Sequence, residues 1–227
     1  MTSTTLPKVV AEMIGAFTLV FVVVLATANG ASLLAVALAY GLAIAVMVAA
    51  LGHVSGGHFN PAVTFAFWLS RRIGGAQAAL YSAAQVFGGL VGALFVAGLV
   101  SRDAVGIGTP QLAGGTGTLK GILAEAIVTF FLVLVIFGTV LDRRAPATVY
   151  PFAIGLTVTA GVLAIAPMTG AALNPARAFG PALVGGEWSA FGAWLIGPLL
   201  GGALAWAVYE YVLAPASDVR PEHARTD

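Results

Sequence analysis

The sequence predicts an all-α membrane protein with six transmembrane helices and two shorter re-entrant half-helices, arranged as an inverted repeat. Of its 227 residues, 59% are hydrophobic and only 8% are charged, a composition that soluble domains do not have. Long apolar runs recur along the chain, and a helix needs about 20 such residues to cross a bilayer. The tripeptide Asn-Pro-Ala occurs twice, each time in an apolar segment too short to cross. Composition, run length and this repeated tripeptide together predict the fold class.

Six apolar runs are long enough to span a bilayer. They occupy roughly residues 9–28, 32–51, 75–100, 120–141, 148–166 and 190–213. The first run follows Lys8 and could be taken for a signal peptide. It is longer than a typical signal core and contains Glu12, so we interpret it as a retained helix. Because six crossings return the chain to its starting side, both termini are expected on one side of the membrane.

Two further apolar segments, at about 59–69 and 173–184, are too short to cross. Both carry the tripeptide, as Asn60, Pro61 and Ala62 in the first and as Asn174, Pro175 and Ala176 in the second. Asn is a good helix N-cap, and Pro is favoured at the first helical position because it has no N–H to leave unpaired. A helix that begins in mid-membrane directs the positive end of its dipole at the bilayer centre. Two such helix starts predict the polar waist of a membrane pore.

The chain divides into two similar halves, about 8–100 and 119–213, joined by a link at 101–118 and followed by a tail at 214–227. Matching residues recur 113 or 114 positions apart, as Glu125 follows Glu12 and Asn174 follows Asn60. Three spans per half require the second half to be inverted, so one half-helix enters from each side. We expect one transmembrane channel domain over residues 1–227, a non-helical Gly- and Thr-rich link, and a short solvated tail.

The basic residues near the spans predict that both termini are cytoplasmic. That topology places five of them inside and two outside: Lys8, Arg71, Arg72, Arg143 and Arg144 against Arg102 and Lys120. We expect a multi-pass protein of the plasma (cytoplasmic) membrane. The net charge is +1 and the basic residues are scattered, which gives no reason to expect nucleic acid as a partner. The chain has no cysteine, and we expect neither a metal nor a cofactor.

The segments around both tripeptides resemble the aquaporins and glycerol channels of the major intrinsic protein superfamily. Residues 52–64 and 169–177 carry the most specific similarity, which extends over about residues 8–212. The resemblance implies the aquaporin-like fold and one pore per protomer for water and small neutral solutes. It also implies a homotetramer surrounded by membrane lipid, and a passive channel in place of an enzyme.

Arg177 is the only basic residue expected inside the membrane, where an arginine is costly unless its donors are used. The resemblance makes it the charged member of an outer selectivity constriction, together with Tyr40, Val162 and Ala171. Water-selective members usually have Phe, His and a small polar residue or Cys at the other three places, so Val162 predicts a wider and less polar opening. Glycerol channels have an aromatic residue in place of Ala171 and an Asp in place of Ala178.

The four constriction residues are most similar to those of the nodulin-like intrinsic proteins of plants and their bacterial relatives. Those proteins pass glycerol and uncharged metalloid hydroxides such as boric, arsenous or silicic acid. We therefore expect a channel for water and small neutral solutes that excludes protons and ions. A strictly water-selective channel is the alternative. A secondary transporter is a more remote one, because inverted repeats with broken helices occur in that class as well.

Two carboxyl groups, Glu12 and Glu125, occupy matching positions in the first span of each half. Carboxyls inside a membrane can couple to protons. The resemblance implies instead that they support the loops that lead into the half-helices, by bonding to backbone N–H groups. It also implies a place near the inner pore mouth for His58, as either a structural histidine or a pH gate, and a place in loop packing for His53.

Overall fold

The computed structural model of the chain describes residues 5–146 and 148–214, and the regular elements of that part are all helical. Six of the helices are long and apolar enough to cross a membrane. They are α1 (Thr5–Ala28), α2 (Leu33–Ser55), α4 (Gly75–Leu99), α6 (Thr118–Ile136), α7 (Tyr150–Thr169) and α9 (Phe191–Val208). Helices α6 and α9 continue in π-helical turns, η1 (Phe137–Leu141) and η2 (Tyr209–Leu213). The predicted six-span, all-α fold is confirmed.

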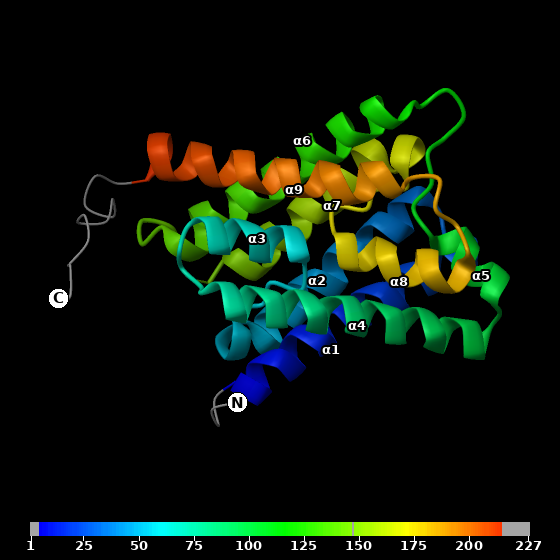
Figure 1. Ribbon diagram of the computed structural model, residues 1–227, viewed down its shortest axis with the longest axis horizontal. Coiled ribbons are helices and arrows are strands. Elements are labelled where there is room, and N and C mark those ends of the chain that lie inside the picture. The colour runs from blue at the N-terminus through cyan, green and yellow to red at the C-terminus, as the bar shows by residue number, and fades with distance from the viewer. Residues whose placement is uncertain (1–4, 147, 215–227) are drawn as a thin grey trace.

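The long helices run side by side along the length of the molecule, and α1 begins at the end of the bundle where α9 finishes (Figure 1). This is the left end in the view of Figure 1, and the link that follows α4 lies at the opposite end. The chain ends of the helical bundle therefore share one side. The solvated tail expected at 214–227 lies outside the described residues, apart from Ala214.

Two short helices, α3 (Pro61–Leu69) and α8 (Pro175–Gly185), follow the two tripeptides. The Asn60 side-chain oxygen accepts a hydrogen bond from the backbone N–H of Ala62 at 2.8 Å, and Asn174 caps α8 in the same way. Nine and eleven residues make helices of roughly 14 and 17 Å, about half of a hydrocarbon core. In Figure 1, α3 occupies the left half of the bundle and α8 the right half. The expected re-entrant half-helices are therefore present, one from each side.

The link between the two halves is partly helical, which corrects the expectation of a non-helical segment at 101–118. A seven-residue helix, α5, covers Arg102–Gly108. Its start carries an ordinary capping signal, because the Ser101 hydroxyl accepts from the backbone N–H of Ala104 at 3.1 Å, and Asp103 lies in the first turn. The overall richness of the link in Gly and Thr obscured that local signal.

Glycines bring helices into close contact both between the two halves and, at matching places, within each half. A Cβ atom on Gly180 of α8 would lie 2.5 Å from the backbone of Gly89 in α4, too close for any side chain. A Cβ on Gly88 would meet the backbone carbonyl of Met13 in α1, and one on Gly201 would meet that of Ala126 in α6. The contact between α1 and α4 is thus repeated by α6 and α9, as an internal repeat requires.

Polarity is distributed as expected of a protein whose solvent is lipid. Large apolar side chains such as Phe87, Phe131 and Phe152 are more than half exposed on the outer surface. Polar side chains gather inside instead, and Glu12, Gln85, Asn60, Asn174 and Arg177 are all buried. Buried polar groups need hydrogen-bond partners, and those of this chain find them in the interior of the bundle.

Candidate functional site

The two half-helices meet through the amides of their capping asparagines. The Asn60 amide donates to the carbonyl oxygen of Leu173 at 2.9 Å, and the Asn174 amide donates to that of Phe59 at 2.9 Å. Phe59 and Leu173 both adopt left-handed backbone conformations, with φ of 49° and 53°. An amide NH2 group has two N–H donors. Each asparagine therefore fixes the opposite loop with one donor and keeps a second.

Glu125 holds the loop that leads into α8. Its carboxylate accepts hydrogen bonds from the Thr169 hydroxyl at 2.6 Å and from the backbone N–H groups of Ala172 at 2.8 Å and Leu173 at 2.7 Å. Glu125 itself has no solvent exposure. The carboxylate thus satisfies backbone donors that no helix satisfies, and it fixes the loop beside the Asn pair.

Glu12 makes the matching contacts in the first half. Its carboxylate accepts from the Ser55 hydroxyl at 2.6 Å and from the backbone N–H groups of His58 at 3.0 Å and Phe59 at 2.6 Å. The Gln85 amide also donates to it, at 2.7 Å. The two carboxylates thus occupy equivalent places under the two loops.

The first half has a polar extension that the second half lacks. The Gln85 amide donates to the Thr64 hydroxyl at 2.9 Å, and this hydroxyl lies 3.1 Å from Nδ1 of His58. Gln85 and Thr64 were not expected as site residues from the sequence. A glutamine in the middle of a long apolar helix was the available signal, because polar side chains inside a membrane span need a reason to be there.

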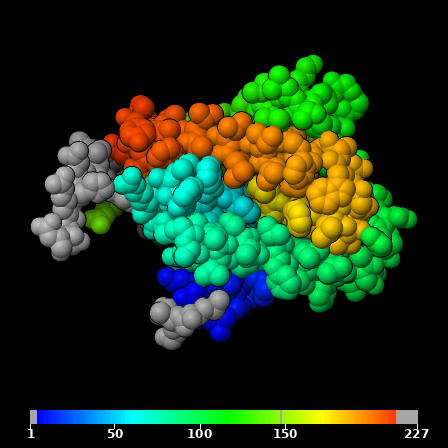
Figure 2. Space-filling model, viewed as in Figure 1, coloured from blue at the N-terminus to red at the C-terminus, as the bar shows by residue number. Residues whose placement is uncertain are grey.

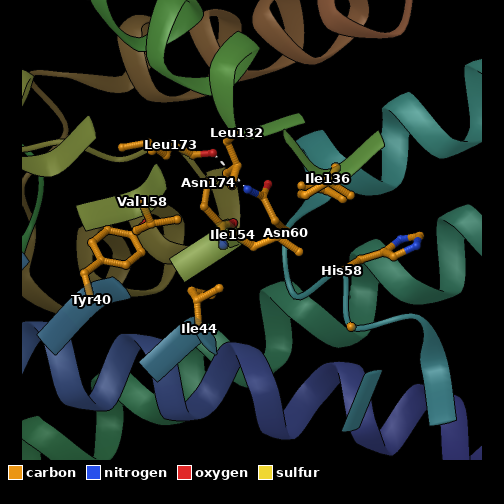
Figure 3. Close-up of a pocket in the computed structure, with 12 residues that line it drawn as sticks. Tyr40, Ile44, His58, Asn60, Leu132, Ile136, Ile154, Val158, Leu173 and Asn174 are labelled. Carbon is orange, nitrogen blue, oxygen red and sulfur yellow. Dashed lines mark hydrogen bonds between the residues drawn. The ribbon is translucent and has the colours of Figure 1, made fainter. Parts of the chain in front are cut away.

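An inner cavity of about 20 Å³ lies at the Asn pair (Figure 3). In Figure 3, Asn60 and Asn174 lie between Tyr40 on one side and His58 on the other. Apolar side chains complete the wall: Ile44, Val63, Leu132, Ile136, Ile154 and Val158. A space of this size admits water in small numbers, since one water needs about 10–15 Å³ on this measure. His58 is buried at this cavity, whereas His53 is exposed.

A larger outer cavity, of about 220 Å³, adjoins the inner one at Tyr40. Val162 and Arg177 line this outer cavity, and Tyr40 lines both. The Tyr40 hydroxyl donates to the carbonyl oxygen of Ala172 at 2.5 Å, which fixes the ring between the two spaces. Ala171, the remaining expected member of the constriction, is fully buried with φ of 50° and lines neither of these two cavities.

Arg177 lies buried at the wall of the outer cavity, 3% exposed. One guanidinium nitrogen, Nη1, donates to the carbonyl oxygen of Gly108 at 3.0 Å, and the guanidinium carbon lies 5.9 Å from the centre of the Tyr40 ring. Its Nε has no hydrogen-bond partner among the described residues. Gly108 ends helix α5, so the unexpected helix of the link supplies the acceptor that positions this arginine.

The chain is similar to known proteins of one family. Residues 1–209 match the model of the family described as major intrinsic protein. Aquaporin TIP4-4 of Zea mays is 48% identical over 179 residues, which cover 78% of this chain and 71% of that protein. Probable aquaporin TIP3-2 of Arabidopsis thaliana is 43% identical over 194 residues, covering 85% and 72%. Aquaporin-4 of Bos taurus is 41% identical over 188 residues, covering 82% and 58%.

A solved structure shares the fold. The X-ray structure of the aquaglyceroporin from Plasmodium falciparum superposes with a TM-score of 0.82 at 23% identity, covering 95% of this chain and 100% of that one. The nearer kinship to nodulin-like proteins stays a prediction, because the relatives named above are TIP aquaporins and an aquaporin-4. The family match over most of the chain, the relatives above 40% identity and the shared fold establish that this chain belongs to the major intrinsic protein family of membrane channels.

Proposed function

We propose that the protein is a passive pore for water and small uncharged solutes, such as glycerol and metalloid hydroxides, which excludes protons and ions. The observation that carries this proposal is the pair Asn60 and Asn174 at one narrow cavity whose walls are otherwise mostly apolar. A water or polyol that enters a membrane loses hydrogen bonds to its solvent. The second donor of each amide and the loop carbonyls replace those bonds.

Positive electrostatic potential at both cavities accounts for the exclusion of cations. Helices α3 and α8 both begin at the Asn pair, so the positive ends of two helix dipoles face the same space. Arg177 adds a full positive charge at the outer cavity. Glu12 and Glu125 have the role of loop supports, since hydrogen bonds from the loops occupy their oxygens.

The outer constriction of this proposal consists of Tyr40, Val162, Ala171 and Arg177. Val162 lines the outer cavity with a small apolar side chain at the place where water-selective relatives carry an imidazole. A valine removes both the bulk and the hydrogen-bonding capacity of that imidazole. The opening therefore accommodates neutral solutes larger than water.

A strictly water-selective pore is the second candidate, and a different observation favours it. The Tyr40 hydroxyl donates to the Ala172 carbonyl at 2.5 Å and holds the ring between the outer cavity and the inner cavity of about 20 Å³. In this candidate, a solute larger than water would pass only if the Tyr40 ring moved. The two candidates thus differ in whether Tyr40 or Val162 sets the size limit.

The proposal also includes the arrangement of the chain in the membrane. The whole chain, residues 1–227, forms one channel domain in the plasma membrane with both termini cytoplasmic, and four copies assemble as a homotetramer. An apolar stripe on α2 offers surface for such assembly, with exposures of 56% at Leu34, 40% at Leu38, 55% at Leu42 and 52% at Val46. Residues spaced by four lie on one helix face.

Stopped-flow light scattering on proteoliposomes tests the proposal. Vesicles are exposed in turn to gradients of an impermeant osmolyte, glycerol, urea and a metalloid hydroxide. Fast shrinkage followed by re-swelling with glycerol or the metalloid hydroxide supports the neutral-solute pore. Fast shrinkage without re-swelling for any solute supports the water-selective candidate. Shrinkage no faster than in protein-free vesicles refutes both.

Two substitutions at one position separate size from polarity. Val162→His narrows the opening, so glycerol flow is expected to fall while water flow persists. Val162→Thr has nearly the same shape as the original side chain and serves as the matched control, because it adds a hydroxyl without adding bulk. Equal glycerol flow in both variants would remove position 162 from the constriction.

A further inference from the structure

A third hollow lies on the outer surface of the bundle, between α3, α4 and α9. We call it the lateral groove, and its wall includes Pro61, Phe65, Trp68, Ala78, Ala79 and Leu199. Its volume is about 320 Å³, within the range of about 300–1,000 Å³ for ligand pockets. Figure 2 views this side of the molecule, with α3 in cyan between α9 in orange and α4 in green. The groove uses a different face of α3 from Val63, which lines the inner cavity.

The lateral groove lies within one leaflet of the bilayer. Pro61 follows the capping Asn60 and so lies at the level of the Asn pair, where the two half-helices meet. Trp68 is seven residues further along α3, which corresponds to roughly 10 Å of helix, and it is 45% exposed. Tryptophan favours the boundary between lipid and water. The groove therefore extends from that boundary toward the middle of the membrane.

The wall of the groove suits a hydrocarbon chain. Helix α4 contributes small residues, Gly75, Ala78 and Ala79, which leave the space open, and α3 contributes aromatic rings. Two hydroxyl groups, those of Thr64 and Ser82, are the exceptions in polarity. The Thr64 hydroxyl already accepts from Gln85 and lies 3.1 Å from Nδ1 of His58, so it needs no hydrogen bond from a ligand.

A positive charge lies beside the end of the groove that is nearest the membrane surface. Arg71 is in the turn between α3 and α4, and residues on both sides of that turn, Trp68 and Gly75, line the groove. Arg71 is exposed and forms no ion pair with the described residues, whereas the adjacent Arg72 pairs with Glu210. Guanidinium groups bind phosphate oxygens well and are favoured near anionic lipid surfaces.

We propose that the lateral groove binds one acyl chain of an anionic phospholipid, from the leaflet on the side of the chain termini, and that Arg71 binds the headgroup phosphate. The site differs from the pore in its residues, in its ligand and in the face of α3 that it uses. Arg71 selects the lipid by the charge of its headgroup, and the apolar wall binds its acyl chain.

Quenching of tryptophan fluorescence by brominated lipids tests this site directly. The full-length protein is reconstituted in phosphatidylcholine vesicles that contain a minor fraction of either phosphatidylglycerol or phosphatidylcholine with brominated acyl chains. The difference between the unmodified protein and Trp68→Phe isolates the signal of Trp68. We expect brominated phosphatidylglycerol to quench that signal at least about twofold more than brominated phosphatidylcholine.

Matched variants assign the effect to the groove. Arg71→Gln is expected to abolish the preference for phosphatidylglycerol, and Arg143→Gln, at another exposed arginine, should retain it. Ala79→Phe fills the groove without a change of charge and should lower the quenching of Trp68 by both lipids. Far-UV circular dichroism verifies that each variant is folded.

Three results would overturn the proposal. Equal quenching by the two lipids in the unmodified protein would remove the headgroup preference, and an unchanged preference in Arg71→Gln would place it elsewhere. An absence of quenching by either lipid would mean that another protein surface, such as a second copy of the chain, covers the lateral groove.

Discussion

At the scale of single residues, the proposed selectivity rests on a small set of buried polar side chains. Asn60 and Asn174 each donate one amide N–H to a carbonyl of the opposite loop, so the second N–H of each amide is available to a permeating molecule. Arg177 donates through Nη1 to Gly108 and lines the outer cavity. Tyr40 ties its hydroxyl to the Ala172 carbonyl between the two cavities. Donors that remain unused at a cavity wall are the groups that can replace the hydration of a solute.

Removal of the Tyr40 hydroxyl tests whether this bond limits passage. In Tyr40→Phe the Ala172 carbonyl loses its partner and becomes available to a permeating molecule, while the ring remains. We expect glycerol and water permeability per protein to rise about two- to tenfold, since a hydrogen bond contributes roughly 0.5–1.5 kcal/mol. Stopped-flow light scattering measures both. Tyr81→Phe is the control, because the Tyr81 hydroxyl donates to the Ser55 carbonyl and lines neither pore cavity. No change in Tyr40→Phe would show that the bond does not limit flow.

Replacement of the Glu125 carboxylate tests the support of the loop. Glu125→Gln keeps the shape of the side chain but replaces one acceptor oxygen by an NH2 group, which cannot accept from Ala172 or Leu173. Leaving one such buried donor unpaired costs about 1–3 kcal/mol. We expect a lower melting temperature in detergent and slower water flow in vesicles. Glu187→Gln, outside the spans, should leave both unchanged. A Glu125→Gln variant as stable and permeable as the original would contradict the supporting role.

At the scale of elements, close contacts between helices hold the half-helices in place. Helix α8 lies against α4 because Gly180 and Gly89 have no side chains, and α2 lies against α7 because Gly41 and Gly155 face each other in the same way. Without glycine the backbones could not approach so closely. The position of the Asn174 cap, at the start of α8, thus depends on glycines that line neither pore cavity.

Two alanine substitutions within α4 test this dependence. Gly89→Ala places a methyl group 2.5 Å from the carbonyl oxygen of Ala176, the last residue of the second tripeptide. We expect a destabilisation of about 1–3 kcal/mol, as in overpacked cores, together with reduced water flow. Gly98→Ala meets no neighbouring atom within 4 Å and should be neutral or slightly stabilising. Thermal denaturation in detergent compares the two variants, and equal melting temperatures would argue against a close contact at Gly89.

The connection between α6 and α7 contains an ion pair with a defined pH dependence. Arg144 donates from its side chain and its backbone N–H to Asp142, which lowers the pKa of that carboxyl to about 2. A depressed pKa means that the contribution to stability is present above the unfolded pKa of about 4 and is lost as the pH falls toward 2. Asp142→Asn should therefore lower the melting temperature slightly at pH 7 and much less at pH 2. A difference as large at pH 2 as at pH 7 would show that Asp142 acts by other means than its charge.

At the scale of the whole molecule, the architecture could be predicted from the sequence because hydropathy and helix capping depend on residues that are close together in the chain. The six spans follow from apolar runs, and the half-helices follow from an Asn-Pro pair that favours a helix start. Helix α5 was missed because its signal consists of one capping Ser101 in a Gly-rich link. The bond from Tyr40 to Ala172 joins residues 132 positions apart and depends on a side-chain rotamer, which no spacing in the sequence determines.

We propose that one pore conducts water and excludes protons, and a paired flux measurement tests this proposal most directly. Proteoliposomes loaded with a pH-sensitive dye are given an osmotic gradient and, separately, a pH gradient under a clamped membrane potential. We expect shrinkage much faster than in protein-free vesicles, with a proton flux equal to that of protein-free vesicles. A proton flux that rises with the amount of reconstituted protein, or shrinkage at the protein-free rate, would contradict it.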